Sequence, residues 1–366
     1  MAGLRLRFRS IALLKQLGPG IITGAADDDP SGIATYSQAG AQSGFGLLWT
    51  VVLTFPLMVA IQLVSAHIGR ITGRGLAANM AKVMPRSLVT ALVFLLFAAN
   101  TINVGADLAA MGEAAGLAVG FGQHVFTVAF ALLSVLLQLF VPYKRYARLL
   151  MVLTLSLLSY VAVMFLVHID WGAAGLAMIG LHADLSPQAA TTIVAVFGTT
   201  ISPYLFFWQS AEEVEELDHH AGKKPLKDDP AEAPKAYRRM RIDTIAGMAA
   251  SNFVALAIMI ATAATLHAAG KTNIQTAADA AKALEPLAGH FAFLLFSSGI
   301  VGTGLLAVPV LAGSAAYAVC ETRGWRIGLD YMPWEAVGFY SVIGAAVALG
   351  LGIDYSGLDP IKALYW

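Results

Sequence analysis

Long apolar runs separated by short polar stretches dominate the chain from its first helix to its end. A membrane-spanning helix needs roughly 20 mostly apolar residues, so runs of this length predict spans. We expect spanning helices at 16–42, 45–69, 87–118, 123–142, 146–169, 189–214, 242–268, 289–320 and 334–353. A tenth run begins near Leu358 and the sequence ends inside it, so we expect a bundle truncated in helix 10. The pattern predicts an all-α membrane protein.

Composition agrees with a location in lipid. Hydrophobic residues make up 58% of the chain and charged residues 13%, with a mean hydropathy of +0.70. An ordinary soluble domain carries about 25% charged residues. The net charge of zero argues against a nucleic-acid binder, which needs a basic surface. The single cysteine, Cys320, excludes an intrachain disulfide and a Cys-x-x-Cys metal site.

Basic residues gather on one side of this map. With the N-terminus in the cytoplasm, 20 of the 23 Lys and Arg residues fall in cytoplasmic segments, and only Lys271, Lys282 and Lys362 fall outside. Cytoplasmic segments of membrane proteins carry this excess of positive charge. We therefore expect a multi-pass protein of the cell (inner) membrane with a cytoplasmic N-terminus. The one long polar stretch, about 216–241, is expected to be a cytoplasmic loop between helices 6 and 7.

The first run contains three consecutive acids followed by a proline. Asp27, Asp28 and Asp29 lie well inside an apolar segment, where one central acid costs roughly 2.5–3.5 kcal/mol on insertion scales. Pro30 lacks an N–H and clashes with the preceding turn, and Gly32 adds backbone freedom. We expect the helix to unwind over 29–32. Unwound backbone at membrane depth is tolerated where it lines a cavity or is buried in protein, so Asp29 is expected to point into a cavity.

The sixth run has a similar interruption at a matching place, where Pro203 directly follows Ser202. Interrupted helices in corresponding positions of two halves point to a transporter site near the bilayer midplane. We expect one transmembrane transporter domain over 1–366, built as an inverted repeat. Its first repeat is expected at about 16–169 and its second, incomplete, at about 189–366.

At these residues the chain resembles the natural resistance-associated macrophage protein (NRAMP) family of divalent metal transporters. The resemblance runs from Gly18 to the end and is strongest over 29–42 and 198–210. It implies a LeuT-type inverted-repeat helix bundle with broken helices 1 and 6. It also implies a transporter rather than an enzyme. Its partners would be a divalent metal substrate and membrane lipid, with no resident cofactor.

The resemblance assigns metal ligands residue by residue. The family's Asp-Pro-Gly-Asn motif reads Asp-Pro-Ser-Gly at 29–32, and its Met-Pro-His motif reads Ser-Pro-Tyr at 202–204. The metal-binding aspartate maps to Asp29, the asparagine to Gly32 and the methionine to Ser202. The family's carbonyl ligand maps near Thr199 and Ile201. Pro30 and Pro203 mark the helix breaks.

Gly32 and Ser202 change the expected chemistry. A thioether favours soft or borderline metals, whereas carboxylate, hydroxyl, carbonyl and water suit Mg²⁺ and Mn²⁺. Losing two side chains also predicts a wider cavity, with room for an ion that keeps part of its water. The pattern therefore resembles the NRAMP-related magnesium/manganese branch most closely, and we expect Cd²⁺ to compete poorly.

Two titratable positions of the family are absent. The helix-6 histidine is replaced by Gln209, and the helix-3 glutamate, three residues after Asp107, by Ala110. We therefore expect little proton coupling. Asp107 is either a pathway residue or a packing group. Asp28 or Asp27 is expected either to line a vestibule or to bind a helix-6 hydroxyl.

Further polar residues lie in or beside the apolar runs. The acids that begin with Glu212 at the end of helix 6 are either a solvated helix end or an acidic vestibule that concentrates cations. Asn100 and Asn103 on the third run are expected to make packing hydrogen bonds.

Two other functions fit parts of the pattern. A cation-coupled amino acid carrier of the same architecture uses glycine-rich breaks to bind a carboxylate, which the acids at 27–29 would repel. An intramembrane aspartyl hydrolase needs two facing aspartates, for which Asp29 and Asp107 could be nominated. Its Gly-x-Gly-Asp motif is absent from the sequence. Metal flux in proteoliposomes, set against peptide cleavage in detergent, separates these classes.

Overall fold

The computed structural model describes residues 18–141, 161–162, 164–165, 167–181, 183–219, 224–274, 276–277, 280–281, 290–329 and 331–356. Over these residues the chain is helical and contains no strand. The helices are α2 (Pro19–Asp27), α3 (Pro30–Ser43), α4 (Leu48–Thr72), α5 (Leu76–Val83), α6 (Arg86–Val119), α7 (Gln123–Phe140), α10 (Trp171–Met178), α11 (Pro187–Thr200), α12 (Pro203–His219), α13 (Ala233–Thr262), α15 (His290–Arg323) and α16 (Val337–Tyr355). Short helical turns are η1 (Gly44–Leu47), η3 (Pro230–Glu232) and η4 (Ala263–His267).

Seven stretches of the described residues are long and apolar enough to cross a membrane: Pro30–Thr72, Arg86–Val119, Gln123–Phe140, Ala189–Asp218, Pro230–His267, Ser297–Arg323 and Val337–Tyr355. The first of them contains both α3 and α4, and the others coincide with expected runs. The expected span at 146–169 lies largely outside the described residues, and the expected helix 10 lies wholly outside them. Large apolar side chains such as Val64, Phe94 and Leu132 are exposed on outward faces, as lipid contact requires.

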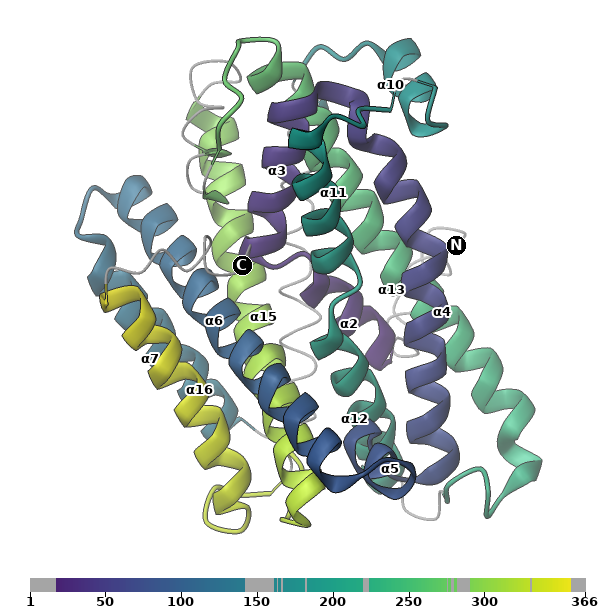
Figure 1. Cartoon of the computed structure of the whole chain (residues 1–366). Helices are drawn as coiled ribbons and strands as arrows, with labels where there is room; N and C mark the ends of the chain where they lie inside the picture. Colours follow the sequence, from purple (N-terminus) through teal and green to yellow (C-terminus); the bar gives the residue numbers. More distant parts are fainter. Residues whose placement is uncertain are drawn as a thin grey trace, which may run out of the picture.

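Two long helices form the centre of the bundle. α6 and α15 have 34 residues each and pack along one another (Figure 1). α7 and α16 cover α6 on one side, and α2, α12 and α13 lie on the opposite side of α15 (Figure 1). This arrangement places the interrupted helices between the central pair and α13.

The close packing of α2 on α13 depends on three glycines. A Cβ atom on Gly24 would stand 2.3 Å from backbone atoms of Gly247, and one on Gly247 would stand 2.0 Å from the carbonyl oxygen of Gly20. Gly20 and Gly24 are four residues apart, the spacing with which small residues let membrane helices approach closely. Backbone therefore lies directly on backbone at this crossing.

Both helix breaks have the same form. α2 ends at Asp27 and α3 begins at Pro30, while α11 ends at Thr200 and α12 begins at Pro203. The expected unwinding over 29–32 is therefore wrong, because only Asp28 and Asp29 lie outside the two half-helices. Proline is favourable at the first position of a helix because its missing N–H has no partner to lose there. Each proline thus begins the second half-helix, and the unwound residues precede it.

The polar loop between helices 6 and 7 is shorter than the expected 216–241. α12 continues to His219, and α13 already begins at Ala233. The described part of the loop lies against the end of α4. The backbone N–H groups of Leu226 and Lys227 donate to the carbonyls of Arg70 and Ile71, at 3.1 and 3.2 Å. Leu226 is buried there.

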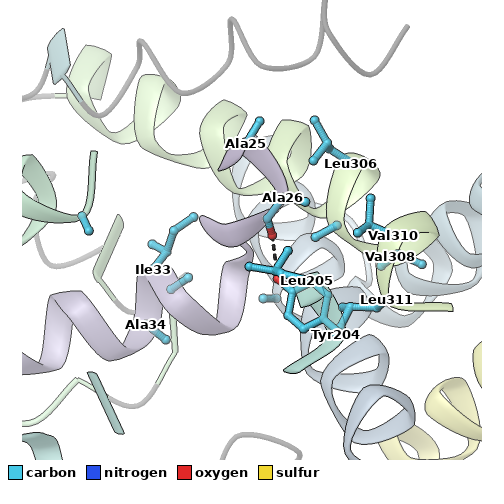
Figure 2. Close-up of a cluster of buried hydrophobic side chains, with 14 of the residues drawn as sticks. Ala25, Ala26, Ile33, Ala34, Tyr204, Leu205, Leu306, Val308, Val310 and Leu311 are labelled. Atoms are coloured by element: carbon cyan, nitrogen blue, oxygen red, sulfur yellow. Dashed lines mark hydrogen bonds between the residues drawn. The ribbon is translucent and has the colours of Figure 1, made fainter. Parts of the chain in front are cut away.

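A buried apolar cluster holds the two breaks against α15. Figure 2 shows members of this cluster from four helices, among them Ala25 of α2, Ile33 of α3, Leu205 of α12 and Leu306 of α15. Both half-helices of the first break, α2 and α3, and the half-helix α12 after the second break pack on α15, which helps to fix where the unwound residues lie.

Candidate metal site

Asp29 caps the N-terminus of α3. One carboxylate oxygen, Oδ1, accepts hydrogen bonds from the backbone N–H of Gly32 at 2.6 Å and the hydroxyl of Ser31 at 2.9 Å. The other, Oδ2, accepts from Nδ2 of Asn103 on α6 at 2.8 Å. Only 2% of Asp29 is exposed. An aspartate is a favoured N-cap residue, so local sequence and helix start together hold this carboxylate at the break.

Three oxygens crowd the space beside Gly32. A Cβ atom there would stand 3.0 Å from Oδ1 of Asp29, 3.2 Å from Oγ1 of Thr199 and 3.3 Å from the carbonyl oxygen of Asp27. The expectation that Gly32 widens the cavity is therefore wrong. The missing side chain lets a carboxylate, a hydroxyl and a carbonyl oxygen from both breaks come together instead.

Ser202 lies in the second break, and its hydroxyl turns back to the end of α11. Its Oγ lies 2.6 Å from the carbonyl oxygen of Thr199 and 3.1 Å from that of Gly198, to which it donates. A hydroxyl has one proton and two lone pairs. Donating to these carbonyls leaves the oxygen of Ser202 able to accept from a water or to contact a cation.

Helix ends of both dipole signs meet around the breaks, because α2 and α11 end there and α3 and α12 begin there. α2 and α11 both end here with carbonyl groups, which carry the negative end of the helix dipole. The opposing positive end of α3 is offset by two carboxylates. Besides Asp29, the fully buried Asp107 accepts the backbone N–H of Ser31 at 3.2 Å through Oδ1. Asp107 therefore lies next to the first break, at the helix end that also holds Asp29.

A cavity of about 710 Å³ adjoins the two breaks. Its polar lining includes Ser31, Asn103, Thr199, Ser202 and Tyr204, and the rest is largely apolar side chains of α6, α11 and α12. Asp29 does not line it, but it is hydrogen-bonded to Ser31 and Asn103, which do. Room is thus present on the Ser202 side of the break and not beside Gly32.

The three consecutive acids point in different directions. Asp27 accepts a hydrogen bond of 2.7 Å from Ser251 on α13, whereas Asp29 faces Asn103 on α6. Asp28 is fully buried, and neither of its carboxylate oxygens has a hydrogen-bond partner among the described residues. The alternative in which Asp28 binds a helix-6 hydroxyl finds no such contact in the described part of the chain.

Gln209 on α12 connects this half-helix to α2. Its side-chain carbonyl accepts a hydrogen bond of 2.7 Å from the hydroxyl of Thr23 on α2, and both residues are completely buried. Gln209 therefore takes a structural position between α2 and α12.

The acidic end of α12 is buried, so the expected solvated helix end is wrong. Glu212 and Glu213 have no exposed surface. Glu213 pairs with Arg239 at 3.0 Å and with Arg70 at 3.9 Å, and Arg239 also pairs with Glu216. Glu212 does not line the cavity beside the breaks. This cluster joins α4, α12 and α13.

Among the described residues, no three His, Cys, Asp or Glu side chains converge as a metal cluster. The oxygens beside Gly32 are one carboxylate, one hydroxyl and one carbonyl oxygen, and the carboxylate of Asp107 lies at the same helix end. Sequence reasoning named Asp29, Gly32, Ser202 and Thr199, but it missed the contact of Asn103 with Asp29. The signal was an asparagine within an apolar helix, which packing alone also explains.

Comparison with known proteins places the fold and family. The family model described as natural resistance-associated macrophage protein-like matches residues 20–366. Divalent metal cation transporters MntH of Yersinia enterocolitica and Klebsiella pneumoniae are each 31% identical over 315 residues, covering 82% of this chain and 71% of theirs.

Solved structures agree in architecture. A manganese transporter from Eremococcus coleocola matches 96% of this chain and 74% of its own, with a TM-score of 0.74 and 18% identity. Mhp1, a nucleobase-cation-symport-1 family transporter, matches 95% of this chain and 74% of its own, with a TM-score of 0.67 and 14% identity. The expected all-α, LeuT-type bundle with broken first and sixth helices is confirmed.

Proposed function

Because the chain belongs to the NRAMP family and is a multi-pass divalent metal transporter, we propose that its physiological ions are Mg²⁺ and Mn²⁺, bound at the two helix breaks. In this proposal Asp29 supplies the charge. Thr199 and Ser202 supply neutral oxygens. The absent side chain of Gly32 lets Oδ1 of Asp29, Oγ1 of Thr199 and the carbonyl oxygen of Asp27 come together, and the cavity on the Ser202 side gives room for the ion. The observation that carries the proposal is the group of three oxygens within 3.3 Å of the missing Cβ of Gly32.

The type of ligand supports hard cations. Carboxylate, hydroxyl, carbonyl and water oxygens are the ligands that Mg²⁺ and Mn²⁺ prefer, whereas Cd²⁺ gains from sulfur. At position 202 a serine hydroxyl stands where the family has a methionine thioether, so the second break itself offers an oxygen in place of sulfur. Mg²⁺ gives up its water reluctantly, and the cavity on the Ser202 side has room for retained water. Carboxylates at the break would repel the carboxylate of an amino acid, so the amino acid carrier is not favoured.

A metal-competition assay tests this function. The purified full chain is reconstituted in liposomes, and Mn²⁺ influx is followed with increasing Mg²⁺ or Cd²⁺ outside. We expect Mg²⁺ to compete and to be transported itself, and Cd²⁺ to compete poorly at equal concentration. Tight inhibition by Cd²⁺ with no effect of Mg²⁺ would show that the assigned selectivity is wrong.

Transport would proceed by alternating access, with an inner-membrane location and a cytoplasmic N-terminus. The charge pattern supports this orientation, since one end of the bundle joins Arg70, Arg239 and the loop that contains Lys224 and Lys227. The two repeats, about 16–169 and 189–366, would each contribute one interrupted helix to the site. Labelling of cysteines introduced at Lys227 and Lys271 from either side of the membrane tests the orientation, because the two positions are assigned to opposite sides.

Proton coupling is expected to be weak. Gln209 is bonded to Thr23, and Ala110 stands where the family has a glutamate, so two titratable groups are missing. Metal influx into liposomes that contain a pH-sensitive dye should leave the internal pH unchanged. Acidification that depends on metal would contradict this, and Asp28 and Asp107 would then be the residues to replace first.

A further inference from the structure

Asn103 makes an asymmetric set of contacts beside Asp29. Its Nδ2 donates to Oδ2 of Asp29 at 2.8 Å. An ionised carboxylate only accepts hydrogen bonds, so the amide must face it with the NH₂ group. The Oδ1 atom of Asn103 consequently points away from Asp29.

That oxygen is buried and has no hydrogen-bond partner among the described residues. Buried polar atoms in folded proteins almost always have a partner, and an exception calls for an explanation. Asn103 also lines the 710 Å³ cavity together with Ser31, Thr199 and Ser202. Asn103, which donates to Asp29, therefore also carries a buried acceptor oxygen that has no hydrogen-bond donor among the described residues.

A second asparagine on the same helix behaves differently. Asn100, almost one turn earlier on α6, donates through Nδ2 to the carbonyl oxygen of Leu311 and to the hydroxyl of Ser314, both at 2.9 Å. These bonds tie α6 to α15, as the expected packing role requires. Within the described part of the chain, Asn103 has no hydrogen bond to α15, and its side chain donates to the carboxylate at the break.

We propose that Asn103 is a further cation-binding residue, whose amide turns over when the ion arrives. In the empty site the NH₂ group holds Asp29. A cation on Oδ2 of Asp29 would repel that group, and rotation of about 180° around the last side-chain bond exchanges the two ends of the planar amide. Oδ1 then faces the ion or one of its waters. This inference rests on the proposed function of the site.

The chemistry suits the ions proposed. An amide oxygen is a neutral, hard ligand of the kind that Mg²⁺ and Mn²⁺ accept. The family places an asparagine at the position of Gly32, and here an amide reaches the carboxylate from α6 instead. Because the amide stays in place and only turns, the same residue stabilises Asp29 in the empty site and the cation in the filled one.

The test measures Mn²⁺ and Mg²⁺ affinity of the purified full chain by calorimetry, with influx kinetics in liposomes. Asn103→Leu removes both ends of the amide, and we expect the Kd and the KM to rise about ten- to hundredfold with a smaller change in maximal rate. Asn103→Asp keeps an oxygen and removes the N–H donor, so affinity is expected to be retained or tightened.

Asn100→Ala is the matched control, and it is expected to lower thermal stability while leaving Kd unchanged. Wild-type affinity in Asn103→Leu would overturn the proposal. So would an affinity loss in Asn103→Asp as large as that in Asn103→Leu, because only the NH₂ group would then matter. If the wild type binds neither Mn²⁺ nor Mg²⁺, or if Asp29→Asn binds them normally, the proposed function itself fails.

Discussion

The phenol of Tyr204 donates a hydrogen bond of 2.7 Å to the carbonyl oxygen of Ala26 (Figure 2). Tyr204 is the second residue of α12, and Ala26 is in the last turn of α2. One bond therefore links the start of a half-helix after one break to the end of a half-helix before the other. Since the two breaks supply the oxygens around Gly32, the bond helps to keep those oxygens in register.

Replacing Asp29 with asparagine is expected to reduce metal influx to background. The amide keeps the shape of the side chain but removes the one charge among the oxygens at the site. Thermal stability is expected to be unchanged or raised, because burying an unpaired charge costs free energy. Uptake and a melting curve are measured on the same preparation. Asp228→Asn, in the exposed part of the loop after α12, should behave as wild type in both.

Replacing Ser202 with methionine is expected to shift the preference toward Cd²⁺. The side chain borders the cavity, so a thioether there has space and offers a soft ligand. The ratio of Cd²⁺ to Mg²⁺ inhibition of Mn²⁺ influx should rise. Ser202→Ala separates the gain of sulfur from the loss of the hydroxyl. An equal ratio in the methionine and alanine variants would mean that residue 202 does not touch the ion.

Gly32→Ala should weaken metal binding although alanine is a better helix former. The new methyl would stand 3.0 Å from Oδ1 of Asp29 and 3.2 Å from Oγ1 of Thr199, and it would force them apart. We expect the KM for Mn²⁺ to rise about tenfold, the scale on which disturbed ligand positions affect metal sites. Gly344→Ala, where the added atom meets open space, should leave transport as it is. A KM that stays unchanged in Gly32→Ala would remove Gly32 from the site.

Arg239→Gln is expected to lower the stability of the bundle and to have little effect on metal selectivity. Glu213 is completely buried and would lose its closer partner, with Arg70 left at 3.9 Å. Breaking a buried pair costs roughly 3–5 kcal/mol, and we expect less because the Arg239 side chain is 28% exposed. Thermal unfolding in detergent measures the loss. Arg241→Gln, which is exposed on the same helix, serves as control. Equal melting temperatures of the two variants would contradict the structural role.

The breaks were predictable from the sequence because proline and clustered acids are strong local signals. Asp29-Pro30 and Ser202-Pro203 fall where the structure interrupts both helices. The limits were misplaced because proline disrupts the turn before it and is well suited to begin a helix. A reading that treats proline only as a breaker therefore places the unwound residues too late.

The contacts across the chain could not be predicted in the same way. Asn103 is 74 residues from Asp29, and Arg239 is 26 residues from Glu213. Apolar periodicity indicates which segments are helices but not which polar side chains will meet. For the same reason Gly32 looked like empty space: the oxygens that fill it come partly from Thr199, which only the fold brings near.

The glycine contact of α2 with α13 makes the position of α2 sensitive to small changes in separation. Where backbone touches backbone, attraction falls steeply with separation, and there are no long side chains to bridge a partial gap. Packed interfaces of this kind exchange between discrete arrangements rather than deforming gradually. Asp243 of α13 reinforces the docked position by accepting the backbone N–H groups of Gly18 and Gly20, at 2.8 and 2.7 Å. Any side chain larger than hydrogen at Gly24 would overlap the backbone of Gly247 and push α2 away from α13, and the contacts of Asp243 with Gly18 and Gly20 would weaken with it.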